Sequence, residues 1–176
     1  EDPSVTLLNI FKQAYVGAKA AKTKYIAIAE DDVLYSYEHF KIVPEGFTYN
    51  ISNWHLHPWT DPPTFGYKGR PNHYSLICPA ESYIEAMEER FAKYPDESKI
   101  PLNFWSHPGH YEKELGVSVH SITEIGKTPP NVVYLHNKAL GRQSYGTTIR
   151  MGLMRAFDIP YWGTATGLME LAGLER

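Results

Sequence analysis

The spacing of apolar residues along the chain predicts helices in several segments. Between residues 4 and 22, leucine, isoleucine, phenylalanine and alanine recur every three or four positions, which is the period of one helix face. Residues 80–94 show the same spacing, with glutamate and arginine on the opposite face, and Pro95 ends the pattern. Further helices are predicted at 111–115, 147–157 and 164–174, with a helical turn at 36–40.

Short apolar or alternating runs between these segments predict β-strands. Residues 25–29 form an uninterrupted apolar run, whereas residues 47–52 alternate with the period of two that a half-buried strand shows. Further strands are predicted at 54–57, 73–78, 117–122 and 132–135, with a loop at 67–72. This mixture of helices and strands indicates the α/β class, here a mixed central sheet flanked by helices in a single domain spanning residues 1–176.

Composition and charge narrow the classes of function. The chain has 176 residues, of which 43% are hydrophobic and 21% charged, as in an ordinary globular domain. Its formal net charge of -3 and pI near 6.3 lack the basic excess of a general nucleic-acid binder. Cys78 is the one cysteine, so no internal disulfide forms, and no apolar run is long enough to span a bilayer. Because residues 1–4 show no signal-peptide pattern, we expect a cytoplasmic protein.

The sharpest chemical feature is the acidic triplet Glu30-Asp31-Asp32, which follows the predicted strand 25–29. Three adjacent carboxylates repel one another and are costly at the edge of a core. A divalent cation with a preference for oxygen ligands, such as Mg²⁺ or Mn²⁺, would relieve that repulsion. Strand alternation predicts Glu30 and Asp32 on one side and Asp31 on the other. The alternative interpretation is a set of solvated loop residues or helix caps.

The stretch from Gly17 to Asp32 resembles the helix, strand and acidic motif of GT-A-type, family-2-like glycosyltransferases. The resemblance implies a Rossmann-like nucleotide-diphospho-sugar transferase fold, with a family-like core at 1–140 and a helical tail at 141–176. It also implies that Glu30-Asp31-Asp32 stands for the family's DxD motif, with Asp32 and Asp31 toward the metal and Glu30 and Asp31 toward the nucleotide. Family members carry several nucleotide-binding strands before this helix, and this chain begins at the helix.

Two later features follow the family's order. Residues 111–116 resemble its acceptor-side helix, which implies that Glu112 or Glu114 is the base for a reaction with inversion at the sugar. His136 follows the predicted strand 132–135, where many members supply a histidine metal ligand. Carboxylate and imidazole ligands together favour Mn²⁺ over Ca²⁺. A solvated helix face and a structural histidine are the alternative interpretations.

The remaining aromatic and basic residues supply candidates for an acceptor site. Trp54 and Trp105 have rings that could stack on a sugar, and His55 and Arg70 could contact its polar groups. Packing in the core is the commoner fate of tryptophan, and a solvated loop is the ordinary place for Arg70. A second histidine, His57, lies two positions after His55 and shares its predicted strand face.

These observations predict a metal-dependent transfer of a hexose from a nucleotide diphosphate sugar, with uridine as the expected nucleoside, to a carbohydrate or other hydroxyl acceptor. One alternative is a non-catalytic or degenerate carbohydrate-binding or interaction module of the same fold. Another is a metal-dependent hydrolase that uses the same acids. An apolar stretch in the tail predicts contact between two copies of the chain through Met151, Leu153, Met154, Phe157 and Trp162.

Overall fold

The computed structural model describes residues 7–96, 99, 101, 107–134 and 154–174. The chain forms two compact units, and each is built from segments that are separated in the sequence. The first unit contains residues 1–28, 43–49 and 72–124. The second unit contains residues 29–42, 50–71 and 125–176.

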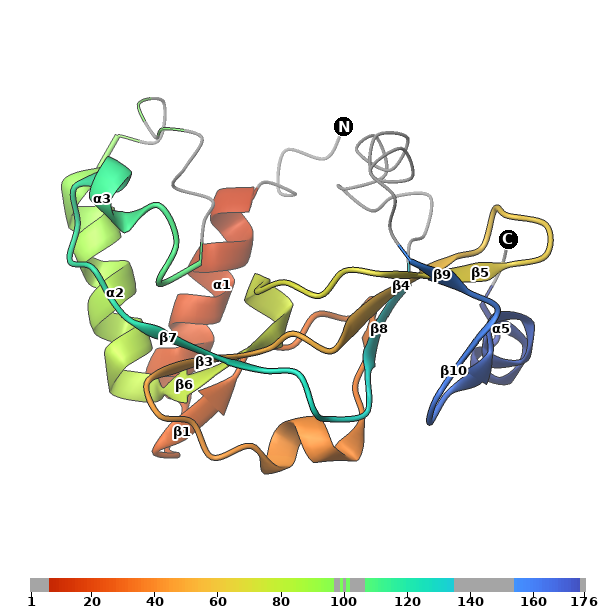
Figure 1. The fold of residues 1–176 in the computed structure, drawn as a ribbon. Coiled ribbons are helices and arrows are strands. Elements are labelled where there is room, and N and C mark those ends of the chain that lie inside the picture. Colours follow the sequence, from red (N-terminus) through yellow and green to blue (C-terminus); the bar gives the residue numbers. More distant parts are fainter. Residues whose placement is uncertain (1–6, 97–98, 100, 102–106, 135–153, 175–176) are drawn as a thin grey trace. The chain divides into compact units, whose positions relative to one another are not determined.

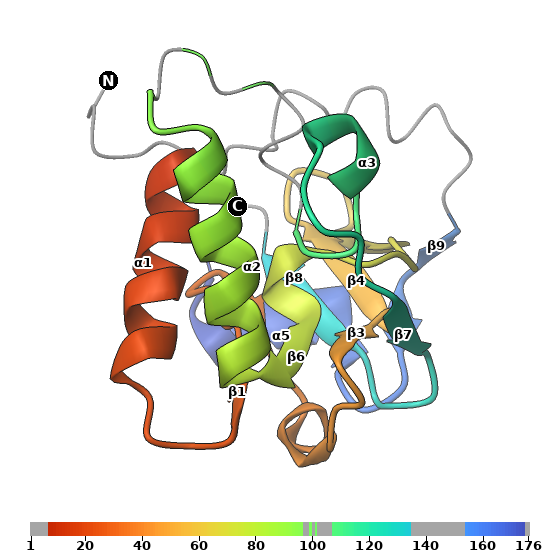
Figure 2. The same cartoon turned by 90° about the vertical axis from the view of Figure 1, so that its left-hand side faces the viewer.

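The first unit packs a pair of helices beside a four-stranded sheet of order β1-β6-β3-β7. Helices α1 and α2 lie side by side (Figures 1 and 2), and the Tyr15 hydroxyl on α1 donates a hydrogen bond of 2.7 Å to Glu88 on α2. Strand β6 pairs antiparallel with both β1 and β3. The elements are α1 (Leu7–Ala20), β1 (Tyr25–Ala27), β3 (Phe47–Asn50), η2 (His73–Ser75), β6 (Leu76–Pro79), α2 (Ala80–Lys93), α3 (Glu112–Leu115) and β7 (Ile122–Ile125).

The second unit is built on a five-stranded sheet of order β2-β8-β4-β5-β9. The sheet is mixed, because β4 and β8 run parallel and the other neighbouring pairs run antiparallel. The elements are β2 (Val33–Leu34), η1 (Tyr37–Lys41), β4 (Asn53–His57), β5 (Thr64–Tyr67), β8 (Asn131–Tyr134), β9 (Arg155–Ala156), the hairpin of β10 (Asp158–Ile159) and β11 (Gly163–Thr164), and α5 (Ala165–Ala172).

The register of this sheet gives it two unlike faces. One row of paired residues crosses all five strands, in the order Val33, Val133, His55, Gly66 and Arg155. Because side chains alternate along each strand, the neighbouring rows point to the opposite face. That opposite face joins α5 and Ile159 in a hydrophobic core of Leu56, Phe65, Val132, Ile159, Ala165, Leu168 and Met169.

The structure confirms the mixed α/β class and most of the predicted helices and strands. The predicted single central sheet is not observed. The strands instead form a four-stranded sheet in the first unit, and a five-stranded sheet and a two-stranded hairpin in the second. The strand predicted at 117–122 is displaced to Ile122–Ile125. Val117 instead packs with Leu8 and Leu115, and the Ser118 N–H donates to the Glu89 carboxylate at 2.9 Å rather than to a neighbouring strand.

The C-terminal tail is only partly helical. Within the predicted helix 147–157, residues 155–156 form β9, which pairs with β5, and residues 147–153 lie outside the described residues. The helix predicted at 164–174 is present as α5, and the Thr164 hydroxyl caps it by accepting a hydrogen bond of 3.1 Å from the Gly167 N–H. Among the described residues, no helix combines the length and the apolar character that crossing a membrane requires.

Replacement by alanine should have opposite effects on the free energy of unfolding at two of the glycines. A Cβ at Gly17, in the exposed interior of α1, meets no atom within 4 Å, whereas a Cβ at Gly66 would lie 2.6 Å from His57 Nε2. We expect Gly17→Ala to raise the free energy of unfolding by about 0.5–1 kcal/mol, because alanine loses less backbone entropy in a helix. We expect Gly66→Ala to lower it by about 1–3 kcal/mol through overpacking. Urea unfolding of the two variants measures both, and equal signs would contradict the described packing.

Candidate functional site

The acidic triplet lies in a turn of the second unit, between β1 and β2. Strand β1 ends at Ala27, and the Val33 N–H donates to the Glu30 carbonyl at 3.3 Å to close the turn. The Tyr134 N–H donates to the Asp32 carbonyl at 2.7 Å, which ties the triplet to the end of β8. Asp31 is exposed, and Glu30 and Asp32 are half-buried. Strand alternation therefore does not set the sides of these carboxylates as predicted, because the strand ends before them.

The carboxylates interact strongly in spite of the turn. Burial raises the pKa of Glu30 from 4.5 to about 7, and the charges of Asp32 and then Asp31 add to the shift. The Glu30 N–H donates a hydrogen bond of 3.0 Å to the Tyr35 hydroxyl. Burial also raises the pKa of Tyr35, with further contributions from Glu30 and Asp32. The triplet is thus a region of concentrated negative potential in which one carboxyl is close to half-protonated at neutral pH.

These oxygen donors fit a hard cation of the Mg²⁺ or Mn²⁺ type. Such an ion is commonly bound by one or two carboxylates and completes its shell with water and substrate phosphate oxygens. In the part of the chain that the structure describes, no group of three histidine, cysteine, aspartate or glutamate side chains is arranged to hold a metal ion, and this includes the three acids of the triplet. His136, the predicted imidazole ligand, lies outside the described residues.

A buried amide and imidazole network lies in the same unit, and no local pattern of residues indicates it. His39 on η1 is fully buried, and its Nδ1 lies 3.2 Å from the side-chain nitrogens of both Asn50 and Asn131. The Asn50 side-chain oxygen accepts from the backbone N–H of Ser52 at 3.0 Å, which fixes the amide with its nitrogen toward His39.

The orientation of the Asn131 amide follows from its contact with Asn53. The Asn53 side-chain nitrogen donates to the backbone carbonyl of Asn50 at 2.7 Å, so its oxygen faces Asn131 and requires the Asn131 nitrogen as donor at 3.4 Å. His39 Nδ1 therefore accepts, and the ring proton is on Nε2. Burial lowers the pKa of His39 to about 4, so this ring is neutral at physiological pH. The network holds η1, which follows the triplet, against the start of β4 and β8.

The predicted base Glu112 is part of a buried ion pair in the first unit. One of its oxygens accepts from Arg90 at 2.8 Å and from the Gly109 N–H at 2.9 Å, and the other accepts from the His120 N–H at 2.6 Å. Burial opposes ionisation, but the hydrogen bonds from Gly109, His120 and Arg90 outweigh it and leave the pKa of Glu112 below its usual value. Glu114 is exposed. The assignment of a base to either residue stays a prediction.

Two of the acceptor-site candidates, Trp54 and His55, lie on opposite faces of the five-stranded sheet. Trp54 packs against the hydrophobic core of the second unit, and its ring centroid lies 5.2 Å from that of Tyr67. His55, the next residue, points to the opposite face of the sheet and is buried. Arg70 is exposed, and Trp105 lies outside the described residues.

The tail residues that were predicted to join two copies of the chain differ in their surroundings. Met154 and Phe157 are exposed, whereas the Trp162 indole donates a hydrogen bond of 2.6 Å to the Pro130 carbonyl. Met151 and Leu153 lie outside the described residues, and the contact itself stays a prediction.

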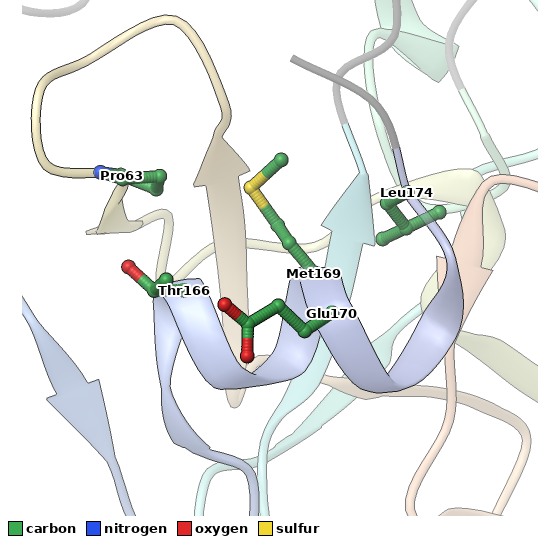
Figure 3. A pocket seen from close by; sticks show the side chains of 5 residues that line it. All are labelled: Pro63, Thr166, Met169, Glu170 and Leu174. Atoms are coloured by element: carbon green, nitrogen blue, oxygen red, sulfur yellow. The ribbon is translucent and has the colours of Figure 1, made fainter.

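A small pocket on the second unit opens between α5 and the turn before β5 (Figure 3). Its walls are apolar side chains together with one hydroxyl and one carboxylate: Pro63, Thr166, Met169, Glu170 and Leu174. This lining supplies no pair of acid and base groups, so the pocket is a poor candidate for catalysis.

Comparisons of the chain with protein-family models, with curated proteins and with solved structures found no match.

Glu30→Gln tests the crowding of the triplet through its effect on stability. A carboxyl whose pKa is raised on folding destabilises the folded state above its unfolded pKa, so this cost is absent below pH 4.5 and complete above about pH 7. We expect Glu30→Gln, without added metal, to raise the free energy of unfolding by up to about 3 kcal/mol at pH 8 and to leave it nearly unchanged at pH 4. Denaturant unfolding at both pH values measures the difference, with exposed Glu85→Gln as control. A pH-independent effect would rule out the raised pKa.

Glu112→Gln tests the buried ion pair. Removing the charge leaves the buried guanidinium of Arg90 without its counter-ion, and we expect the free energy of unfolding to fall by about 3 kcal/mol or more. The double variant Arg90→Met with Glu112→Leu replaces both charges by apolar groups and should recover part of this loss. Thermal unfolding of the three proteins provides the comparison. A single variant as stable as the wild type would show that the pair does not hold this region.

Proposed function

We propose that the chain is a metal-dependent glycosyltransferase of GT-A-type fold that transfers a hexose from a nucleotide diphosphate sugar to a hydroxyl acceptor. Uridine is the expected nucleoside of the donor, and a carbohydrate is the expected acceptor. The observation that supports this best is the acidic triplet, where Asp32 and Asp31 help to raise the pKa of Glu30 to about 7. A protein gains little stability from such crowding, so a role in binding a cation is the natural explanation.

The proposed roles of the three acids follow the resemblance. Asp32 and Asp31 would bind Mn²⁺ or Mg²⁺, with His136 as a further ligand, and Glu30 would face the nucleotide. When bound, the cation would offset the negative charge that grows on the leaving diphosphate. The hydrogen bond from the Tyr134 N–H to the Asp32 carbonyl holds the triplet at the end of β8, the strand that precedes residue 136.

The transfer itself requires a base on the acceptor side. The acceptor oxygen forms a bond to the anomeric carbon, the bond from that carbon to the diphosphate oxygen breaks, and the acceptor proton passes to a carboxylate. Of the two proposed bases, Glu112 already has its oxygens bound by Arg90, Gly109 and His120. Glu114 is exposed, and we assign the role of base to it for a reaction with inversion.

The metal site is tested by thermal unfolding with and without Mn²⁺. We expect Mn²⁺ to raise the Tm of the wild type and of the control Asp158→Asn, which removes an exposed carboxylate of the same unit on β10. We expect Asp32→Asn to lose the shift. Since Glu30 binds a proton with a pKa of about 7, cation binding near neutral pH should also release protons, which titration calorimetry in two buffers of different ionisation enthalpy detects.

The absence of a metal-dependent shift in the wild type would contradict the proposed site. Transfer assays with a panel of nucleotide sugars then separate the remaining possibilities. Binding of carbohydrate without turnover would favour the non-catalytic module of the same fold, and metal-dependent hydrolysis that needs no acceptor would favour a hydrolase.

A further inference from the structure

The face of the five-stranded sheet that points away from its hydrophobic core gathers nitrogen-bearing side chains. His55 on β4, Gly66 on β5 and Arg155 on β9 form one row of paired residues, so His55 and Arg155 flank a position that has no side chain. Their neighbours Leu56, Phe65 and Ala156 belong to the apolar face, which confirms the alternation.

The ring of His57 occupies the space above Gly66. A Cβ built on Gly66 would lie 2.6 Å from His57 Nε2, so no larger residue fits there without moving the ring. His57 is two residues after His55 and shares its face of β4. Both rings are buried, and the centre of this face is therefore an imidazole pair rather than an aliphatic layer.

Positive charge surrounds the two imidazoles. Burial and then the charges of Arg155 and Lys68 lower the pKa of His57 to about 4. Burial, Lys68, His57 and Arg70 likewise lower the pKa of His55 to about 3. Burial and Arg70 lower the pKa of Lys68. Lys68 and Arg70 thus lie within electrostatic range of His55, and Lys68 and Arg155 lie within range of His57.

Two cations of this cluster, Lys68 and Arg155, have no carboxylate partner among the described residues. Lys68 is half-buried, and keeping an unpaired ammonium there is unfavourable. An anion that accepts hydrogen bonds from ammonium, guanidinium and imidazole groups would relieve this cost.

We propose that His55, His57, Lys68, Arg70 and Arg155 form a binding site for the phosphate group of a ligand. The triplet adjoins β2, and three strand spacings separate β2 from β5, which is a distance of about 14 Å. We therefore assign the phosphate to a second molecule, separate from a diphosphate held at the triplet. The proposed anion binding does not depend on the proposed function. We assign the second molecule as a phosphorylated sugar acceptor, and this assignment does rest on the proposed function.

The site is tested with inorganic diphosphate as a probe on the whole chain in EDTA, by titration calorimetry at low salt. We expect binding that weakens with salt, because exposed Arg70 and Arg155 contribute to it. Lys68→Gln and Arg155→Gln should each weaken binding by about tenfold, and the double variant should abolish it. Lys68→Arg, which keeps the charge, and Lys22→Gln, which removes an exposed lysine of the first unit, should bind as the wild type does.

Other ligands and variants separate this site from the metal site. Asp32→Asn should leave diphosphate binding in EDTA unchanged, so failure of the metal site and failure of the anion site are distinguishable. A hexose phosphate should compete with diphosphate. Competition by uridine diphosphate alone would overturn the assignment to an acceptor. Absence of diphosphate binding, or equal binding by the wild type and a folded double variant, would overturn the anion site itself.

Discussion

Burial of the Glu30 carboxyl beside the charges of Asp32 and Asp31 is the constraint on which the proposed cation site depends. The chain brings the three acids together in a turn where Glu30 and Asp32 are half-buried, and the pKa of Glu30 rises to about 7 as a result. Backbone hydrogen bonds from Val33 to Glu30 and from Tyr134 to Asp32 hold the backbone of this turn. The proposed cation would relieve this cost.

The rest of the second unit supports that turn through two different kinds of packing. On one face of the sheet, aliphatic and aromatic residues join α5 in a hydrophobic core. On the other face, polar groups replace that layer: the amides of Asn53 and Asn131 bind the neutral ring of His39, and an imidazole and cationic cluster surrounds Gly66. One sheet thus carries an apolar face and a face with polar and charged side chains, on which the proposed anion site lies.

Local patterns predicted α1, α2 and α5 because amphipathic spacing depends only on neighbouring residues. They predicted the acidic triplet directly after a strand, with strand alternation setting the sides of its carboxylates, whereas the strand ends at Ala27 and the triplet lies in a turn before Val33. Features that depend on long-range pairing were not predictable. Arg155–Ala156 is a strand because β5 pairs with it, and the partner of Glu112 is Arg90, 22 residues earlier. The cationic cluster likewise exists only because sheet register places Arg155 in the row of His55.

The proposed cation site depends on the ionisation of the Glu30 carboxyl, and that ionisation is directly measurable. Carbon-13 NMR of the glutamate side-chain carboxyls, assigned with Glu30→Gln, follows Glu30 through a titration of the metal-free protein. A cation site at the triplet predicts a midpoint near pH 7 for Glu30, which moves to lower pH when Mg²⁺ is added, because a cation favours the carboxylate form. A midpoint near 4.5 that Mg²⁺ does not change would contradict it.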